Sequence, residues 1–109
     1  MTSREERVAR NETAAREINE GIEQAHAKNE EARYFRILCE CGKADCEQVI
    51  GITRSEYEQV RSDPVRFVVR RDHVDPSVED IVSETDRFVV VAKREGIPAE
   101  VAEEEDPRQ

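Results

Sequence analysis

All three cysteines of this 109-residue chain lie within eight consecutive positions, at Cys39, Cys41 and Cys46. Thiolates that converge from one tight turn are typical of a metal site, and Gly42 supplies the backbone freedom for such a turn. With three Phe, two Tyr and no Trp, the chain has a small core. A metal ion then contributes a large share of the folding free energy. The sequence therefore predicts a small fold held together by a metal ion, Zn²⁺ by preference.

Tetrahedral zinc needs a fourth ligand, and His73 is the best candidate, because it follows a predicted strand in a turn that can reach the cysteine loop. His26 lies in the middle of a predicted helix. Glu40 and Asp45 offer oxygen atoms, which are less favoured beside thiolates. The predicted metal ligands are Cys39, Cys41, Cys46 and His73.

The spacing C-x-C-x4-C departs from the usual C-x2–4-C of zinc sites, so other interpretations of the cluster stay open. A disulfide between Cys41 and Cys46 would make a redox switch, and Lys43 would favour the ionised thiol. An iron–sulfur cluster would need a fourth ligand, either His73 or a residue of a second chain. The remaining alternative is three reduced cysteines without metal.

The charge of the chain argues against nucleic acid as a partner. It carries 26 acidic and 17 basic residues, a formal net charge of −9. Phosphate binding requires clustered Lys and Arg, and a basic stripe would have to come from Arg66, Arg70, Arg71 and Arg87.

The sequence predicts no membrane span and no signal peptide. No run reaches the roughly 18 apolar residues of a membrane span, and the charged N-terminal residues lack the apolar stretch of a signal peptide. We expect a cytoplasmic protein without membrane contact, in which thiols stay reduced.

A long helix is predicted over residues 3–31, with Ser3 as its N-cap, so that residues 1–32 form an N-terminal helical segment. Its apolar stripe is thin and includes Val8, Ile18 and Ile22. Such a stripe suits either packing on the sheet of the same chain or contact with a protein partner or a second copy.

From residue 33 the hydrophobic period changes to that of strands. Strands are predicted over 34–38, 48–52, 65–70 and 87–93. A capping box, Thr53 with Glu56, starts one short helix, and a second is predicted over 76–84. The fold class is α+β: a long N-terminal helix, then a small, mainly antiparallel four-stranded sheet with two short helices, stapled by metal. Residues 33–94 form this zinc-knuckle domain, and 95–109, rich in acids, a flexible tail.

The motif F-x3-C-E-C-G-x3-C from Phe35 to Cys46, with His73 downstream, resembles a group of small uncharacterised bacterial proteins. The similarity extends over nearly the whole chain. It implies the architecture and the suspected ligands, but no reaction. Members of that group tend to have glycine before the histidine, where this chain has Asp72.

No catalytic motif accompanies the cysteines: the sequence has no glycine-rich phosphate loop, zinc-protease helix motif or nucleophile elbow. We therefore predict a non-enzymatic, small zinc-binding regulatory or adaptor protein. It would act through protein–protein contacts, with a partner or a second copy, on the N-terminal helix. The alternative is a thiol-based redox or metal sensor, in which zinc loss or thiol oxidation releases that helix.

Overall fold

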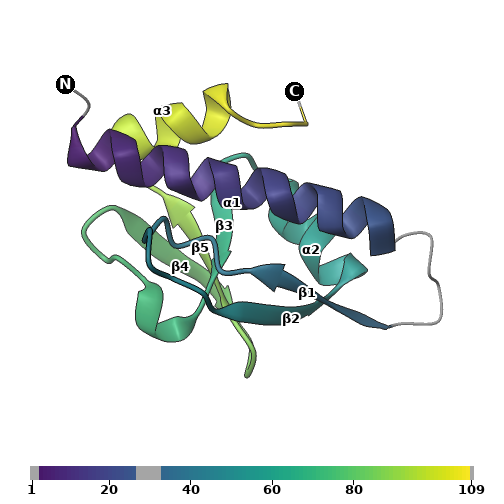
Figure 1. Cartoon of the computed structure of the whole chain (residues 1–109). Coiled ribbons are helices and arrows are strands. Elements are labelled where there is room, and N and C mark those ends of the chain that lie inside the picture. Colours follow the sequence, from purple (N-terminus) through teal and green to yellow (C-terminus); the bar gives the residue numbers. More distant parts are fainter. Residues whose placement is uncertain (1–2, 27–32, 109) are drawn as a thin grey trace.

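The computed structural model describes residues 3–26 and 33–108. Helix α1 (Arg4–His26) begins as predicted, because the Ser3 hydroxyl accepts a hydrogen bond from the amide of Glu6 at 3.1 Å. Residues 27–31 of the predicted helix lie outside the described residues. α1 runs the length of the molecule, with β1 on one side and α3 on the other (Figure 1).

Two small antiparallel sheets make up the rest of the framework. The first pairs β1 (Tyr34–Leu38) with β2 (Val49–Thr53), and the second has the order β3-β5-β4. Its strands are β3 (Arg66–Val69), β4 (Glu79–Glu84) and β5 (Val89–Lys93). The α+β class, the long first helix and the antiparallel pairing are confirmed. The detail of one four-stranded sheet is corrected to five strands in two sheets.

The predicted helix over 76–84 is wrong, because Glu79–Glu84 forms strand β4. A turn follows Asp75, and the β-branched Ile81 then pairs with Val91 of β5, with Val82 at a register shift before Ser83 pairs with Val90. In a helix over 76–84, these two residues would form part of a buried apolar face. In the strand, Ile81 is 53% exposed and Val82 43% exposed. Pairing with β5 therefore determines the structure of this segment, against the helical spacing of its apolar residues.

The capping box is confirmed at the start of α2 (Arg54–Arg61). The Thr53 hydroxyl accepts a hydrogen bond from the Glu56 amide at 3.1 Å, and the Glu56 carboxylate accepts one from the Thr53 amide at 2.9 Å. α2 buries Tyr57 and Val60, as the sequence predicts. They join a core with Phe35, Ile37, Ile50, Ile52, Phe67, Val89 and Val91.

The flexible acidic tail is also corrected, because helix α3 (Ile97–Glu104) occupies its centre and packs on α1 (Figure 1). Ala99, Val101 and Ala102 are buried, whereas the acids of this helix face solvent. Small apolar residues let two helices approach closely, so a segment that is acidic in composition still has one apolar face.

α1 docks with an unexpected face. Its buried residues are one alanine and six polar residues: Ala9, Glu12, Thr13, Arg16, Asn19, Glu20 and Glu23. Ile18, which belongs to the predicted apolar stripe, is 54% exposed. Buried polar groups need hydrogen-bond partners, so the segments that supply them decide which face docks. These are the cysteine loop, Lys93 of β5, the end of α2 with Pro64, and the C-terminal segment. No helix in the described segments is long and apolar enough to cross a membrane.

Candidate metal centre

The structure brings the four predicted ligands together. The sulfur atoms of Cys39, Cys41 and Cys46 and a ring nitrogen of His73 all lie within 4.8 Å of one another. The Nδ1 atom of His73 is 3.4 Å from Cys39 Sγ and 3.5 Å from Cys46 Sγ. With metal–sulfur and metal–nitrogen bonds of about 2.3 and 2.0 Å, the S···N edge of a zinc tetrahedron measures about 3.5 Å. The two S···N distances therefore match those of a tetrahedral metal site.

Two segments position these ligands. The cysteines lie on the loop between β1 and β2, at the tip of the predicted hairpin, and His73 ends the short 3₁₀ helix η1 (Arg71–His73) after β3. The His73 amide donates a hydrogen bond to the Arg70 carbonyl at 2.9 Å, which fixes this turn. Nε2 of His73 is 3.8 Å from a carboxylate oxygen of Asp72, and a carboxylate on that side suits a ligand that binds through Nδ1.

Gly42 fits the cysteine loop closely against α1. Its φ is +75°, a conformation that residues with a Cβ atom rarely adopt. A Cβ atom here would lie 2.6 Å from the Val8 carbonyl oxygen and 2.7 Å from Cγ of Glu12. Asn11 Nδ2 donates a hydrogen bond to the Gly42 carbonyl at 3.1 Å. The loop and the first turns of α1 therefore fix each other's position.

Glu40, between two of the cysteines, joins the two sheets instead of offering a ligand. Its amide donates to the Val68 carbonyl at 2.8 Å, and its carboxylate accepts hydrogen bonds from the Val68 amide at 2.9 Å and Asn19 Nδ2 at 2.8 Å. Glu40 is fully buried, and this burial raises its pKa to about 7. The C-x-C spacing thus places a buried polar anchor between two thiols, a role that the sequence did not reveal.

Asn19 of α1 is the second residue that sequence reasoning missed. Its side chain accepts a hydrogen bond from the Leu38 amide at 2.8 Å and donates one to the Leu38 carbonyl at 2.9 Å. These bonds continue the backbone pairing of β1 just before the cysteines. No local pattern distinguishes this asparagine from an exposed one.

The other ligand candidates lie outside the donor group. The His26 ring stacks on the Phe35 ring, with 4.5 Å between the ring centroids, and Asp45 is exposed.

The thiols share protons with one another. A hydrogen bond from Cys39 lowers the pKa of Cys41 to about 5, and the same bond, together with burial, raises the pKa of Cys39. The Arg70 amide also donates to Cys39 Sγ at 3.3 Å. A bound metal ion would replace the shared protons, because metals bind cysteine as thiolate.

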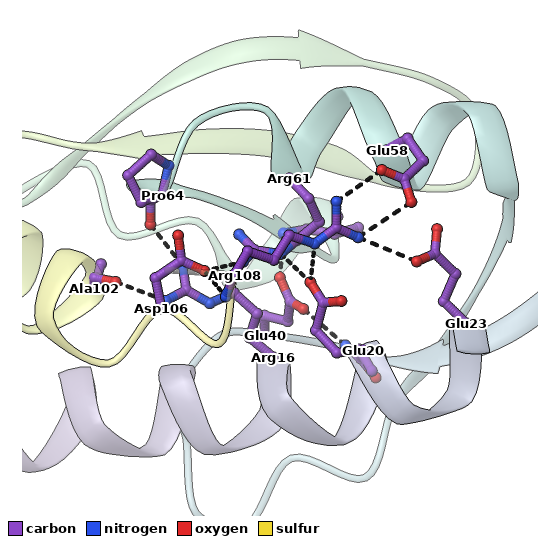
Figure 2. Close-up of polar contacts among 12 residues, drawn as sticks. Arg16, Glu20, Glu23, Glu40, Glu58, Arg61, Pro64, Ala102, Asp106 and Arg108 are labelled. Carbon is purple, nitrogen blue, oxygen red and sulfur yellow. Dashed lines mark hydrogen bonds and ion pairs between the residues drawn. The ribbon is translucent and has the colours of Figure 1, made fainter. Parts of the chain in front are cut away.

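A second polar assembly holds the far end of α1 (Figure 2). Arg61 of α2 is fully buried between Glu20 and Asp106. Arg108 reaches Glu20 at 2.7 Å and also contacts α2. We call this group the C-terminal clasp: Glu20, Glu23, Glu58, Arg61, Asp106 and Arg108.

Three of the arginines that could form a basic stripe have carboxylates beside them, so they do not make a surface of uncompensated positive charge. Arg66 lies 3.9 Å from Asp63, Arg71 2.7 Å from Glu84, and the Arg87 guanidinium forms two hydrogen bonds with Glu56. Each of these three cations has a carboxylate beside it. Their charge is therefore largely balanced within the chain.

No family model, curated protein or solved structure matches this chain. The fold and the site therefore define its class on their own: a small α+β protein with a Cys₃His group that could hold a metal ion. The resemblance to small bacterial proteins remains a prediction.

Proposed function

We propose that Cys39, Cys41, Cys46 and His73 bind one zinc ion, and that the chain is a small zinc-binding protein. The observation that carries this proposal is the convergence of four donor atoms within 4.8 Å from two separate segments. Three thiolates and one imidazole are a donor set that zinc prefers, and four protein ligands are typical of a structural site.

In this proposal zinc joins the β1–β2 loop to the turn after β3, and so holds the two sheets together. Structural zinc contributes about 10–16 kcal/mol of apparent binding free energy in small peptides. The net stability of a whole domain is only about 5–15 kcal/mol. The ion would therefore contribute a large share of the stability of a core as small as this one.

Four protein ligands leave no open position for a substrate or a reactive water, so we assign the site no enzymatic role. We propose instead that the protein acts as a regulatory or adaptor protein through protein–protein contacts. The solvent face of α1 is the surface we favour, since Ile18 is 54% exposed there. The carboxylates beside Arg66, Arg71 and Arg87 favour a protein partner over nucleic acid.

Metal analysis of the purified full chain tests the zinc site. We expect about one zinc per chain in the wild type, loss of most of it in His73→Ala, and retention in His73→Cys, because four thiolates also bind zinc. The His73→Cys variant is the matched control for damage to the turn. A folded, metal-free wild type, titrated with zinc without binding it, would contradict the proposal.

The contact surface is tested with Ile18→Glu. We expect this variant to lose self-association in sedimentation, or capture of a specific protein from its host, while zinc content stays at the wild-type level. Gln24→Glu, at another exposed position of α1, is the control for added charge. Equal association of both variants and the wild type would argue against this face.

A second candidate function, a thiol-based redox sensor, is favoured by the closeness of the three sulfur atoms and by the partial exposure of Cys46. One peroxide molecule would take two electrons from the Cys41 and Cys46 thiolates and two protons from solvent, giving a disulfide and two waters, with release of zinc. We would measure zinc release and the loss of two hydrogens by intact mass, with Cys46→Ser as the control. Zinc that stays bound under stoichiometric peroxide would exclude this function.

A further inference from the structure

The docking face of α1 differs from that of most surface helices, which bury an apolar stripe. Six of its seven buried residues are polar, and each such group is stable there only while its hydrogen-bond partner stays in place. When α1 leaves its site, its own surface exposes little apolar area. Docking of α1 therefore depends on the shape of the segments that supply its partners.

The cysteine loop supplies the partners of Asn11 and Asn19, whereas Glu12 and Arg16 between them pair with Lys93 and with the Pro64 and Ala102 carbonyls. Asn11 bonds the Gly42 carbonyl, and Asn19 bonds both backbone groups of Leu38 and the carboxylate of Glu40. Gly42 fits so closely under Val8 that no room for a Cβ atom is left. All of these loop atoms lie within four residues of the cysteines that we assign to the metal.

The last turns of α1 have different partners. Glu20 contacts Arg61 at 2.5 Å, and Arg108 contacts Glu20 at 2.7 Å and Glu23 at 3.1 Å. These ion pairs come from α2 and from the C-terminal segment (Figure 2), and none of their residues is a neighbour in sequence of the cysteines. The bonds of Asn11 and Asn19 with the cysteine loop and the ion pairs of Glu20 and Glu23 thus come from separate segments.

We propose that zinc strengthens the docking of α1 over residues 4–19 through the contacts with the cysteine loop, whereas the C-terminal clasp holds residues 20–26 without zinc. This inference rests on the proposed zinc site and extends it to regulation. Loss of zinc frees the loop over 38–46, and the loop loses the shape that matches Asn11 and Asn19. Residues 4–19 of α1 then keep the contacts of Glu12 and Arg16 but open more often from β1. Phe35 and Ile37, which are buried in the core beside α1, then become accessible.

Thermodynamic linkage makes the effect reciprocal. If zinc favours the docked helix by some factor, docking favours zinc by the same factor. Asn11 and Asn19 are not ligands, yet their replacement by alanine should weaken zinc binding. Coupling between two sites typically amounts to about 5- to 150-fold, which sets the expected size of the change.

Hydrogen exchange of the full chain, with and without zinc removal by a chelator, tests the proposal. Zinc content is measured first in the same samples. We expect removal of zinc to raise exchange of residues 4–19 by about 5- to 150-fold more than that of β3 and β5. Arg108→Gln should do the opposite, with faster exchange confined to residues 20–26. Asn19→Ala should lower zinc affinity, and Gln24→Ala, at an exposed position of the same helix, should not.

Each result decides the matter. Unchanged exchange of α1 in a chain that binds zinc would overturn the inference and leave the zinc site intact. An equal rise across α1, β3 and β5 would overturn it too, because zinc would then stabilise the whole fold without selectivity. If the wild type binds no zinc, the proposed function fails first. Asn19→Ala with normal sheet protection and normal zinc affinity would break the reciprocal link.

Discussion

The N-terminal and C-terminal parts of α1 pack on the rest of the chain through different kinds of contact. Toward its N-terminus, the helix meets the cysteine loop through uncharged amide hydrogen bonds and a close steric fit at Gly42. Toward its C-terminus, it meets the C-terminal clasp, which consists of ion pairs from α2 and the chain end. The first contact depends on the shape of a loop, and the second on the charge of its groups. The first should therefore respond to metal, and the second to pH.

The largest expected effect is at the metal end. Cys41→Ser should abolish tight zinc binding and lower the free energy of unfolding more than the changes below, because structural zinc contributes about 10–16 kcal/mol of apparent binding energy in small peptides. Zinc content and a urea unfolding curve measure this. Lys43→Ala, in the same loop but exposed, is the control and should keep both. A folded, zinc-loaded Cys41→Ser variant would remove Cys41 from the ligand set.

The second largest loss of stability is expected from a change at Arg61, the centre of the C-terminal clasp. Arg61→Met should cost about 3–5 kcal/mol of unfolding free energy, because it leaves the carboxylates of Glu20 and Asp106 without their buried cation. The matched control is Arg10→Met, whose side chain is 56% exposed and whose ion pairs should contribute about 1 kcal/mol or less. Similar losses in both variants, measured by urea unfolding, would mean that the clasp stabilises α1 no more than a surface pair does.

Two glycines provide a matched pair at the other contact. Gly42→Ala should cost about 2–4 kcal/mol, since it adds both an unfavourable φ and an overlap with Val8. Gly21→Ala, with nothing within 4 Å of its Cβ position, should instead gain up to about 1 kcal/mol from higher helix propensity. Thermal unfolding at saturating zinc measures both. A neutral Gly42→Ala would show that the loop tolerates a looser fit than the structure indicates.

The smallest effect is a pH dependence at the clasp. Burial and a hydrogen bond shared with Glu58 raise the pKa of Glu23 to about 7, from its ordinary value of 4.5. Between these values the folded state holds a proton that the unfolded chain releases, so this group's contribution to stability falls as pH rises toward 7. Glu23→Gln keeps the neutral form, and its stability relative to the wild type should rise from pH 5 to pH 7.5. Glu17→Gln, at an exposed position of α1, should show no such trend.

The features that the sequence predicted well are those that neighbouring residues define. The Thr53–Glu56 capping box, the Ser3 N-cap and the β1 and β2 strands depend on residues within a few positions of one another, and the structure confirms them. The grouping of three cysteines is equally local. His73 was selected by its residue type and by the turn in which it stands, and the structure places it beside the sulfur atoms.

Only the tertiary structure decided which face of α1 is buried, that residues 79–84 form a strand, and that the acidic segment contains a docked helix. In each case the deciding partner is distant in the chain: Asn19 bonds Leu38, and Arg108 bonds Glu20 from 88 positions away. A buried polar residue is stable only where such a partner exists, and periodicity in hydrophobicity carries no information about it. The amino-acid sequence alone therefore determined the donor set and the local elements, while long-range hydrogen bonds and ion pairs fixed how α1 covers them.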